Sequence, residues 1–338
     1  MTMEYRNLGR SGVKVSCLCL GCMNFGGRTG EEESLRIIHR AIDEGINFLD
    51  TSNSYSAGAS ETIVGKALAD GGRRDKVVLA TKVTTRMGEG VNDEGSSRHH
   101  IMRQVEGSLK RLQTDRIDLY QLHWMDFTTP IEETLRSLDD LVRAGKVLYI
   151  GCSKFAPAWL VEAIMTSQRF GWAQFVSEQP PYNLLDRRIE NELIYTCQKF
   201  GVGIIPWAPI AAGILSGKYR EDTPIAPGGR FREMNSRLTP AALERVAGLL
   251  PLAAEKGVEL AALALAWVMR QPGITSPITG PRTLAHLTSS LKAVEVQLAP
   301  EDFARIDAVC PPGSCVSDYY DCNVFRRYRR ASGFGGQG

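Results

Sequence analysis

The chain has 338 residues, of which 43% are hydrophobic and 23% are charged, and its 40 lysines and arginines nearly balance its 38 aspartates and glutamates. This composition is typical of a soluble globular protein and excludes a disordered, collagen-like or strongly charged chain. A formal net charge of +2 creates too weak a field to indicate nucleic acid as a partner.

Two features of the chain predict a cytoplasmic protein without a membrane partner. The longest apolar stretch, Val258 to Met269, is shorter than the ~18 residues that a transmembrane helix needs. The first residues, Met1 to Arg6, carry charge but are not followed by the apolar core of a secretory signal.

The eight cysteines are too few for a disulfide scaffold, and we expect them to be free thiols. Cys19 and Cys22 have CxxC spacing, but no second pair of cysteines or histidines lies at zinc spacing and no thioredoxin-like context surrounds them. Cys17 and Cys19 fit one face of a short buried strand, where cysteine acts as a small hydrophobic side chain. We therefore expect no metal site.

Short apolar runs alternate with longer helical patterns along the chain. The eight runs are Cys17–Leu20, Ile46–Leu49, Val77–Ala80, Ile117–Leu122, Val147–Ile150, Phe175–Ser177, Val202–Pro206 and Ile274–Ile278. Amphipathic segments between them include Glu31–Glu44, Ser97–Leu112, Ile131–Arg143, Ala158–Arg169 and Ile189–Phe200. Alternation of this kind implies parallel strands that are buried on both faces. Eight such units predict an α/β protein with a (β/α)8 TIM barrel, whereas an open doubly wound sheet usually has fewer units and a glycine-rich first turn.

Several segments fall outside this repeat. Tyr5–Leu8 and Val13–Ser16 flank a glycine-containing turn and predict an N-terminal β-hairpin that could plug one end of the barrel. Ala211–Leu238 is too long for a routine loop after a strand, so we expect a lid or binding loop there. We expect one domain over residues 1–338, with the barrel over about residues 17–293 and a C-terminal extension over residues 294–338.

The C-terminal region contains two motifs to which we assign no binding role. The GxGxxG pattern at Gly333–Gly338 has no preceding strand and no following helix, so it cannot hold a phosphate group. The basic run Arg326–Arg330 is interpreted as a solvated tail rather than a nucleic-acid site.

Four ionisable residues lie at or just after the ends of predicted strands two, three and four. Asp50 follows the second run with Tyr55 in its loop, Lys82 follows the third run, and His123 follows the fourth. Each alone has an ordinary structural explanation: a cap, a loop aromatic, a surface cation or a satisfied histidine. Because the carboxyl ends of barrel strands share one face, we expect the four side chains to meet in an active site.

These four side chains suit the donation of a proton to a developing alkoxide. A phenol ionises near pH 10, and an ammonium beside it lowers its pKa, so we expect Lys82 to lower the pKa of Tyr55. Asp50 would keep Lys82 charged, and His123 would give a second hydrogen bond to the substrate oxygen. No activated nucleophile or metal cluster accompanies them, so the electrons must come from a cofactor, most simply a nicotinamide.

From about Tyr5 to about Asp307 the chain resembles the aldo-keto reductase family. The motifs that carry the resemblance are Gly45–Tyr55, Ala80–Lys82, Leu119–Trp124, Arg143–Val147, Gly151–Phe155, Glu178–Leu185 and Trp207–Pro209. The resemblance implies that Tyr55 is the general acid, that Lys82 and Asp50 tune it, and that His123 orients the carbonyl. It also implies NAD(P)H bound in an extended pose across the barrel mouth, usually NADPH with NADH as the alternative, which explains the missing glycine-rich turn.

The resemblance further implies cofactor contacts. Ser153 and Gln179 would hold the carboxamide, Trp207 would stack on the nicotinamide, and Arg282 near a helix N-terminus suits a 2′-phosphate. The other residues implied to contact the cofactor are Cys22, Met23, Asp50, Lys154, Pro209, Ile210, Ala211, Ala212, Lys218, Arg230, Gly280, His286 and Ser290.

Some positions depart from the family pattern and leave the choice between NADPH and NADH open. Lys154 stands where Asn is usual, His286 where Gln is usual, Ser290 where Asn is usual, and Ser56 where Gly commonly follows the catalytic tyrosine.

The sequence thus predicts NADPH-dependent reduction of a small aldehyde or ketone to an alcohol, in a reversible reaction. The alternative is a cofactor-sensing regulatory or channel-associated subunit built on the same barrel. The four intact residues of the predicted site favour the enzyme. The identity of the carbonyl compound and the oligomeric state stay open.

Overall fold

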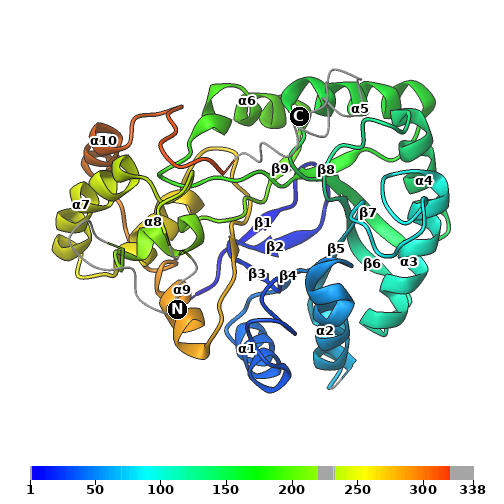
Figure 1. Cartoon of the computed structure of the whole chain (residues 1–338), viewed down its shortest axis with the longest axis horizontal. Helices are drawn as coiled ribbons and strands as arrows, with labels where there is room; N and C mark the ends of the chain where they lie inside the picture. The colour runs from blue at the N-terminus through cyan, green and yellow to red at the C-terminus, as the bar shows by residue number, and fades with distance from the viewer. Residues whose placement is uncertain (1, 70, 220–230, 232, 320–338) are drawn as a thin grey trace.

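Eight parallel strands form a barrel at the centre of the molecule, and helices surround it (Figure 1). The computed structural model describes residues 2–69, 71–219, 231 and 233–319. The barrel strands are β3 (Cys19–Gly21), β4 (Phe48–Asp50), β5 (Val78–Val83), β6 (Ile117–Leu122), β7 (Val147–Cys152), β8 (Phe175–Glu178), β9 (Gly203–Ile204) and β10 (Ile278–Thr279). Each strand from β3 to β9 pairs in parallel with the next, and β10 pairs in parallel with β3.

The backbone of residues 274–279 closes the barrel between β9 and β3. On one side the amide of Thr275 donates to the carbonyl of Ile204 at 2.8 Å, and the amide of Ile278 donates to the carbonyl of Pro206 at 2.8 Å. On the other side β10 forms its parallel ladder with β3. The predicted (β/α)8 fold is therefore confirmed.

Helices cover the outside of the barrel. They are α1 (Glu31–Asp43), α2 (Ala59–Ala69), α3 (Arg98–Leu112), α4 (Ile131–Arg143), α5 (Pro157–Phe170), α6 (Leu193–Phe200), α7 (Pro240–Glu255), α8 (Leu260–Met269), α9 (Leu284–Lys292) and α10 (Pro300–Val309). Short 3-10 helices occur at η1 (Tyr55–Gly58), η2 (Arg73–Lys76), η3 (Arg188–Asn191) and η4 (Ala211–Ser216). In α4, Ile131, Leu135 and Leu138 are buried whereas Glu132 and Arg136 are exposed, as helical periodicity requires. The helix predicted from Ile189 begins instead as η3, and α6 starts only at Leu193.

Strand β5 is longer than the apolar run that predicted it. The run was expected to end at Ala80, but the ladder with β6 continues through the pairs Lys82 with Gln121 and Val83 with Leu122. Lys82 is therefore inside the strand rather than after it. Ala80 and Lys82 point to the same face because side chains alternate along a strand, and Ala80 belongs to the cluster in the barrel interior. Lys82 thus enters the barrel itself, where a charge was not expected.

The N-terminal hairpin plugs the amino-terminal end of the barrel. Strands β1 (Tyr5–Asn7) and β2 (Lys14–Ser16) pair in antiparallel fashion. Leu8 and Val15 are fully buried in a cluster with inward-facing residues of the barrel strands. The turn between them reaches the segment that joins α6 to β9, because the amide of Arg10 donates to the carbonyl of Gly201 at 2.7 Å. The predicted hairpin and its plugging position are confirmed.

Parts of the remaining expectations fall on residues that are not described. The loop predicted as a lid over Ala211–Leu238 begins with η4, but residues 220–230 and 232, including Arg230, lie outside the described residues. The basic run and the glycine motif of the C-terminal tail lie outside them as well. No helix in the described ranges is both long enough and apolar enough to cross a bilayer.

The packing of the hairpin plug can be tested at Gly9, whose φ of +56° lies in the left-handed region. A Cβ there would lie 2.7 Å from the backbone nitrogen of Gly203 and 2.8 Å from the carbonyl oxygen of Gly201. We expect Gly9→Ala to lower the free energy of unfolding by about 2–4 kcal/mol. Gly12→Ala is the matched control, because open space surrounds Gly12 in the same turn, and it should change stability by less than about 0.5 kcal/mol. Equal effects in denaturant unfolding would contradict the packing of the plug.

Candidate active site

A buried ion pair between Lys82 of β5 and Asp50 at the end of β4 forms the base of the site. The Lys82 Nζ atom lies 2.5 Å from Asp50 Oδ1, and both side chains are almost completely buried. Nζ also donates to the carbonyl oxygen of Thr51 at 2.8 Å and to the hydroxyl of Tyr55 at 3.3 Å. Burial by itself lowers the pKa of Lys82, but Asp50 and Tyr55 together raise it above its ordinary value. Lys82 therefore stays protonated.

Tyr55 stays a protonated phenol at neutral pH. Burial raises the pKa of Tyr55, and this effect outweighs the lowering by Lys82. Lys82 lowers the pKa of Tyr55 as expected, but burial and the charge of Asp50 both raise it, so the net change is upward. Because Lys82 donates to the oxygen of Tyr55, the phenol's own hydrogen can be donated to a group in the adjoining pocket.

His123 lies beside Tyr55 at the end of β6. Its ring meets the Tyr55 ring edge-on with the centroids 5.8 Å apart. Its Nδ1 atom is 3.2 Å from the hydroxyl of Thr85 and 3.4 Å from the hydroxyl of Ser52, which fixes the orientation of the ring. The other face stacks on Trp124 at 4.8 Å between centroids. The structure thus brings the four predicted ionisable residues together.

Two amides complete the surroundings of Asp50. Gln121 and Gln179 each donate from Nε2 to Asp50 Oδ2 at 2.9 Å, and Gln179 also donates to Gln121 Oε1 at 3.1 Å. One carboxylate oxygen therefore receives the ammonium of Lys82 and the other receives two amides. Gln179 was among the predicted residues, but Gln121 was not singled out. It lies inside β6, where only its pairing with Lys82 identifies it.

A pocket of about 740 Å³ extends across the barrel mouth beside Tyr55. The predicted residues that line it are Met23, Asp50, Tyr55, His123, Ser153, Lys154, Gln179, Trp207, Pro209, Ile210, Ala212, Lys218, Gly280, Arg282, His286 and Ser290. Lys82 contacts the Tyr55 hydroxyl from inside the barrel and is not part of the lining. Cys22 and Ala211 are fully buried and do not line it either. The backbone of Cys22 is hydrogen-bonded within the protein. Its amide donates to the backbone carbonyl of Asp50, and its carbonyl accepts from the hydroxyl of Ser60.

The lining carries an excess of positive charge. Its cations are Arg28, Lys154, Lys218, Arg237 and Arg282. Within the described part of the lining the carboxylates are Asp50, which is paired with Lys82, and Glu259, which accepts from the Ser289 hydroxyl at 2.5 Å. Burial lowers the pKa of His286, and the positive charges of Arg282 and Lys218 lower it further. Lys218, Arg282 and His286 together fit a ligand with several phosphate charges, such as a dinucleotide.

Comparison with known proteins agrees with this geometry. Residues 17–310 match the model of the Aldo/keto reductase family. The chain belongs to this family. It is 42% identical to an uncharacterized oxidoreductase, YrpG, of Bacillus subtilis over 94% of this chain and 99% of that protein. It is 38% identical to a probable voltage-gated potassium channel subunit beta of Oryza sativa over 91% of this chain and 96% of that protein. It is also 38% identical to a versiconal hemiacetal acetate reductase of Aspergillus parasiticus, over 90% and 96% of the two chains.

As a member of the aldo/keto reductase family, the protein is an NAD(P)H-dependent oxidoreductase that acts on carbonyl compounds. The structure gives a physical reason why glycine is usual at the position of Ser56. Ser56 and Ala57 have φ angles of 49° and 53°, and Gly58 has a φ of 94°. Three successive left-handed residues directly follow Tyr55, a conformation that favours glycine and is strained for other residues.

Other residues of this reductase's pocket were missed by the sequence analysis. They include Asn24, Arg28, Arg237, Glu259 and Tyr319. Arg237 lies near the end of the long loop predicted over Ala211–Leu238, and Tyr319 belongs to the C-terminal extension. The loop was expected to be a lid or binding loop, but no motif singles out either residue within its segment.

The buried ion pair of this reductase can be tested by a double-mutant cycle. Lys82→Met and Asp50→Asn should each lower the free energy of unfolding by about 3–5 kcal/mol, because each leaves a buried charge without its partner. The double variant should lose clearly less than the sum of the two. Denaturant unfolding measures all four proteins. Strictly additive losses would show that the two charges do not stabilise each other.

Proposed function

We propose that this reductase converts an aldehyde or ketone into an alcohol with NADPH as the electron donor and Tyr55 as the proton donor. The observation that carries the proposal is the protonated Tyr55 hydroxyl in the pocket wall, anchored by the buried Lys82 and Asp50. When bound, NADPH supplies a hydride to the carbonyl carbon and becomes NADP⁺.

Tyr55 gives its proton to the carbonyl oxygen as the carbon–oxygen double bond becomes a single bond. The phenolate left behind is stabilised by the ammonium of Lys82, 3.3 Å from its oxygen, and then regains a proton from solvent. His123, whose ring lies beside Tyr55 and lines the pocket, provides a second contact for the substrate oxygen. The reverse sequence oxidises the alcohol.

The residues at the barrel mouth fit the cofactor. The Nε2 atom of Gln179 already donates to Asp50 and Gln121, so its Oε1 atom is the one that would accept from the carboxamide. The hydroxyl of Ser153, which donates to the backbone carbonyl of Gln179 at 2.7 Å, would also contact the carboxamide. Trp207 would stack on the nicotinamide ring. Lys218 would bind the pyrophosphate, and Arg282 would bind the 2′-phosphate.

A second candidate function is that of a cofactor-sensing subunit of a larger assembly. It is favoured by the two relatives named as probable voltage-gated potassium channel beta subunits, at 38% and 37% identity. Quenching of protein fluorescence by NADPH, with no turnover of any aldehyde in a panel, would favour this function. NADPH oxidation that depends on an aldehyde would favour the reductase.

Removal of the phenol hydroxyl tests the role of Tyr55. We expect Tyr55→Phe to lower kcat at least about 1,000-fold and to leave the Kd of NADPH within about twofold, because the hydroxyl serves only the proton transfer. Stopped-flow or steady-state NADPH oxidation gives the rate, and fluorescence titration gives the Kd. Losses of binding and of rate by the same factor would contradict this role.

Charge removal at Arg282 tests the cofactor preference. We expect Arg282→Ala to weaken NADPH binding about tenfold or more and to change NADH binding less than about twofold, because only NADPH carries the 2′-phosphate. Arg305→Ala is the matched control, since Arg305 pairs with Glu255 at the surface, outside the pocket lining. If Arg282→Ala left the ratio of the two Kd values unchanged, Arg282 would not bind that phosphate.

A further inference from the structure

A wall of three side chains from distant segments bounds part of the pocket. Tyr319 meets Trp207 edge-on with the centroids 6.2 Å apart, and the guanidinium carbon of Arg237 lies 4.8 Å from the centre of the Tyr319 ring. All three residues line the pocket. Lys154 connects this wall to the catalytic residues, because its ammonium lies 5.9 Å from the centre of the Trp207 ring and 5.0 Å from that of Trp124, which stacks on His123.

The wall is held in place by the C-terminal segment. The amide of Val316 donates to the carbonyl of Leu185 at 2.9 Å, and the amide of Tyr319 donates to the carboxylate of Asp186 at 2.9 Å. The amide of Asp318 donates to the carbonyl of Ser236 at 2.9 Å, next to Arg237. Three segments of the chain are thus connected at this corner of the pocket.

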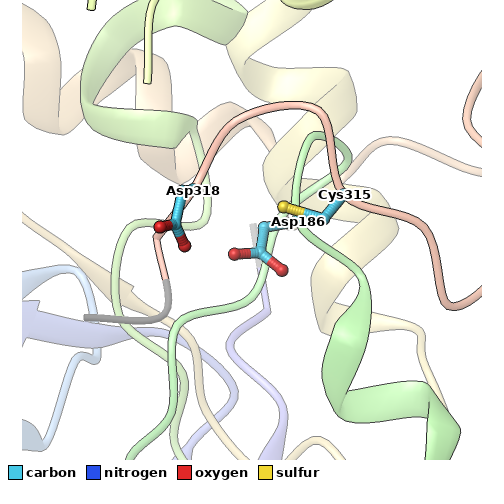
Figure 2. Close-up of side chains that lie close together, drawn as sticks. All are labelled: Asp186, Cys315 and Asp318. Carbon is cyan, nitrogen blue, oxygen red and sulfur yellow. The ribbon is translucent and has the colours of Figure 1, made fainter. Parts of the chain in front are cut away.

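The same corner contains a group of possible metal ligands, but the guanidinium of Arg188 already pairs with its two carboxylates. Figure 2 shows Asp186, Cys315 and Asp318 close together. The Nη2 atom of Arg188 lies 2.6 Å from a carboxylate oxygen of Asp186 and 2.6 Å from one of Asp318. The guanidinium takes the position that a metal ion would need, so we interpret the cluster as a clamp. The carboxylate of Asp318 consequently pairs with Arg188 and not with Arg237.

Arg237 keeps most of its donors unused. Its Nε donates to the backbone carbonyl of Asp318 at 3.3 Å, and within the described ranges its two Nη atoms have no hydrogen-bond acceptor and no carboxylate partner. Lys154 adds a second positive charge to the lining, with its ammonium 5.9 Å from the centre of the Trp207 ring. The described carboxylates of the lining are occupied elsewhere, Asp50 by Lys82 and Glu259 by Ser289.

We propose that the carbonyl substrate carries a carboxylate, which Arg237 binds at this wall. A half-buried guanidinium whose two Nη groups find no acceptor in the described part of the chain is costly, and a carboxylate matches its planar fork of donors. A neutral substrate would leave these donors unsatisfied, so the site discriminates against it. The inference rests on the proposed reductase function and specifies its substrate class. A cofactor phosphate is the other anion that the guanidinium could bind, and the connection of the wall to His123 through Lys154 and Trp124 favours the substrate.

The test compares 4-carboxybenzaldehyde with its neutral analogue methyl 4-formylbenzoate. In Arg237→Met, which keeps an apolar stem on Tyr319, we expect kcat/KM for the carboxylate to fall about 10- to 100-fold, mainly through KM. The value for the ester should stay within about twofold, as should the Kd of NADPH. Arg237→Lys, which keeps the charge, should retain part of the preference for the carboxylate.

Three outcomes would overturn the inference. Equal losses for both aldehydes would indicate that Arg237 only supports the fold of the wall. A loss of NADPH affinity with an unchanged substrate ratio would assign Arg237 to the cofactor. An unchanged kcat/KM for 4-carboxybenzaldehyde would show that Arg237 does not bind the carboxylate.

If the wild-type protein reduced neither aldehyde, the proposed reductase function would fail separately from this inference. The binding of 4-(hydroxymethyl)benzoate and of the corresponding amide, measured by calorimetry on the NADPH-loaded protein, then decides. Tighter binding of the benzoate that is lost in Arg237→Met would support the anion site. Equal binding of the two compounds would overturn it.

Discussion

Lys82 carries a positive charge inside the barrel, and the arrangement of the site follows from the need to compensate that charge. The ammonium is surrounded by one carboxylate oxygen of Asp50, one backbone carbonyl and the phenol oxygen of Tyr55. Gln121 and Gln179 satisfy the second oxygen of the carboxylate. A buried group with all its hydrogen bonds made has no freedom to rearrange, so the hydroxyl of Tyr55 is held in a fixed position before any ligand binds.

The two ends of the barrel have different tasks. The N-terminal hairpin seals one end with apolar packing around Leu8 and Val15, which serves stability. At the opposite end, charged side chains and residues with strained backbone conformations surround the pocket. There Tyr55 is followed by three left-handed residues, and Lys154, φ 60°, is left-handed as well. Such conformations persist only where the surrounding structure supports them, which is typical of functional sites.

Local sequence patterns predicted most of the fold and the residues at the centre of the site, but not the residues at the edge of the pocket. Apolar runs and helical periodicity predicted the barrel because each strand is buried on both faces. Asp50, Tyr55, Lys82 and His123 could be found because they follow or end strands. The position of Lys82 within β5 and the raised pKa of Tyr55 depend on partners from other strands and on burial. The roles of Gln121, Arg237 and Tyr319 arise only from tertiary contacts, which no local pattern encodes.

The transfer of deuterium from NADPH labelled at C4 of the nicotinamide to 4-nitrobenzaldehyde tests the central claim most directly. We expect an alcohol with one deuterium on its carbinol carbon, delivered by only one of the two C4 epimers because the pocket presents one face of the ring. With unlabelled NADPH in D₂O, that carbon should carry no deuterium, since solvent reaches only the oxygen. Solvent deuterium on the carbon, or bound NADPH without any label transfer, would contradict carbonyl reduction at this site.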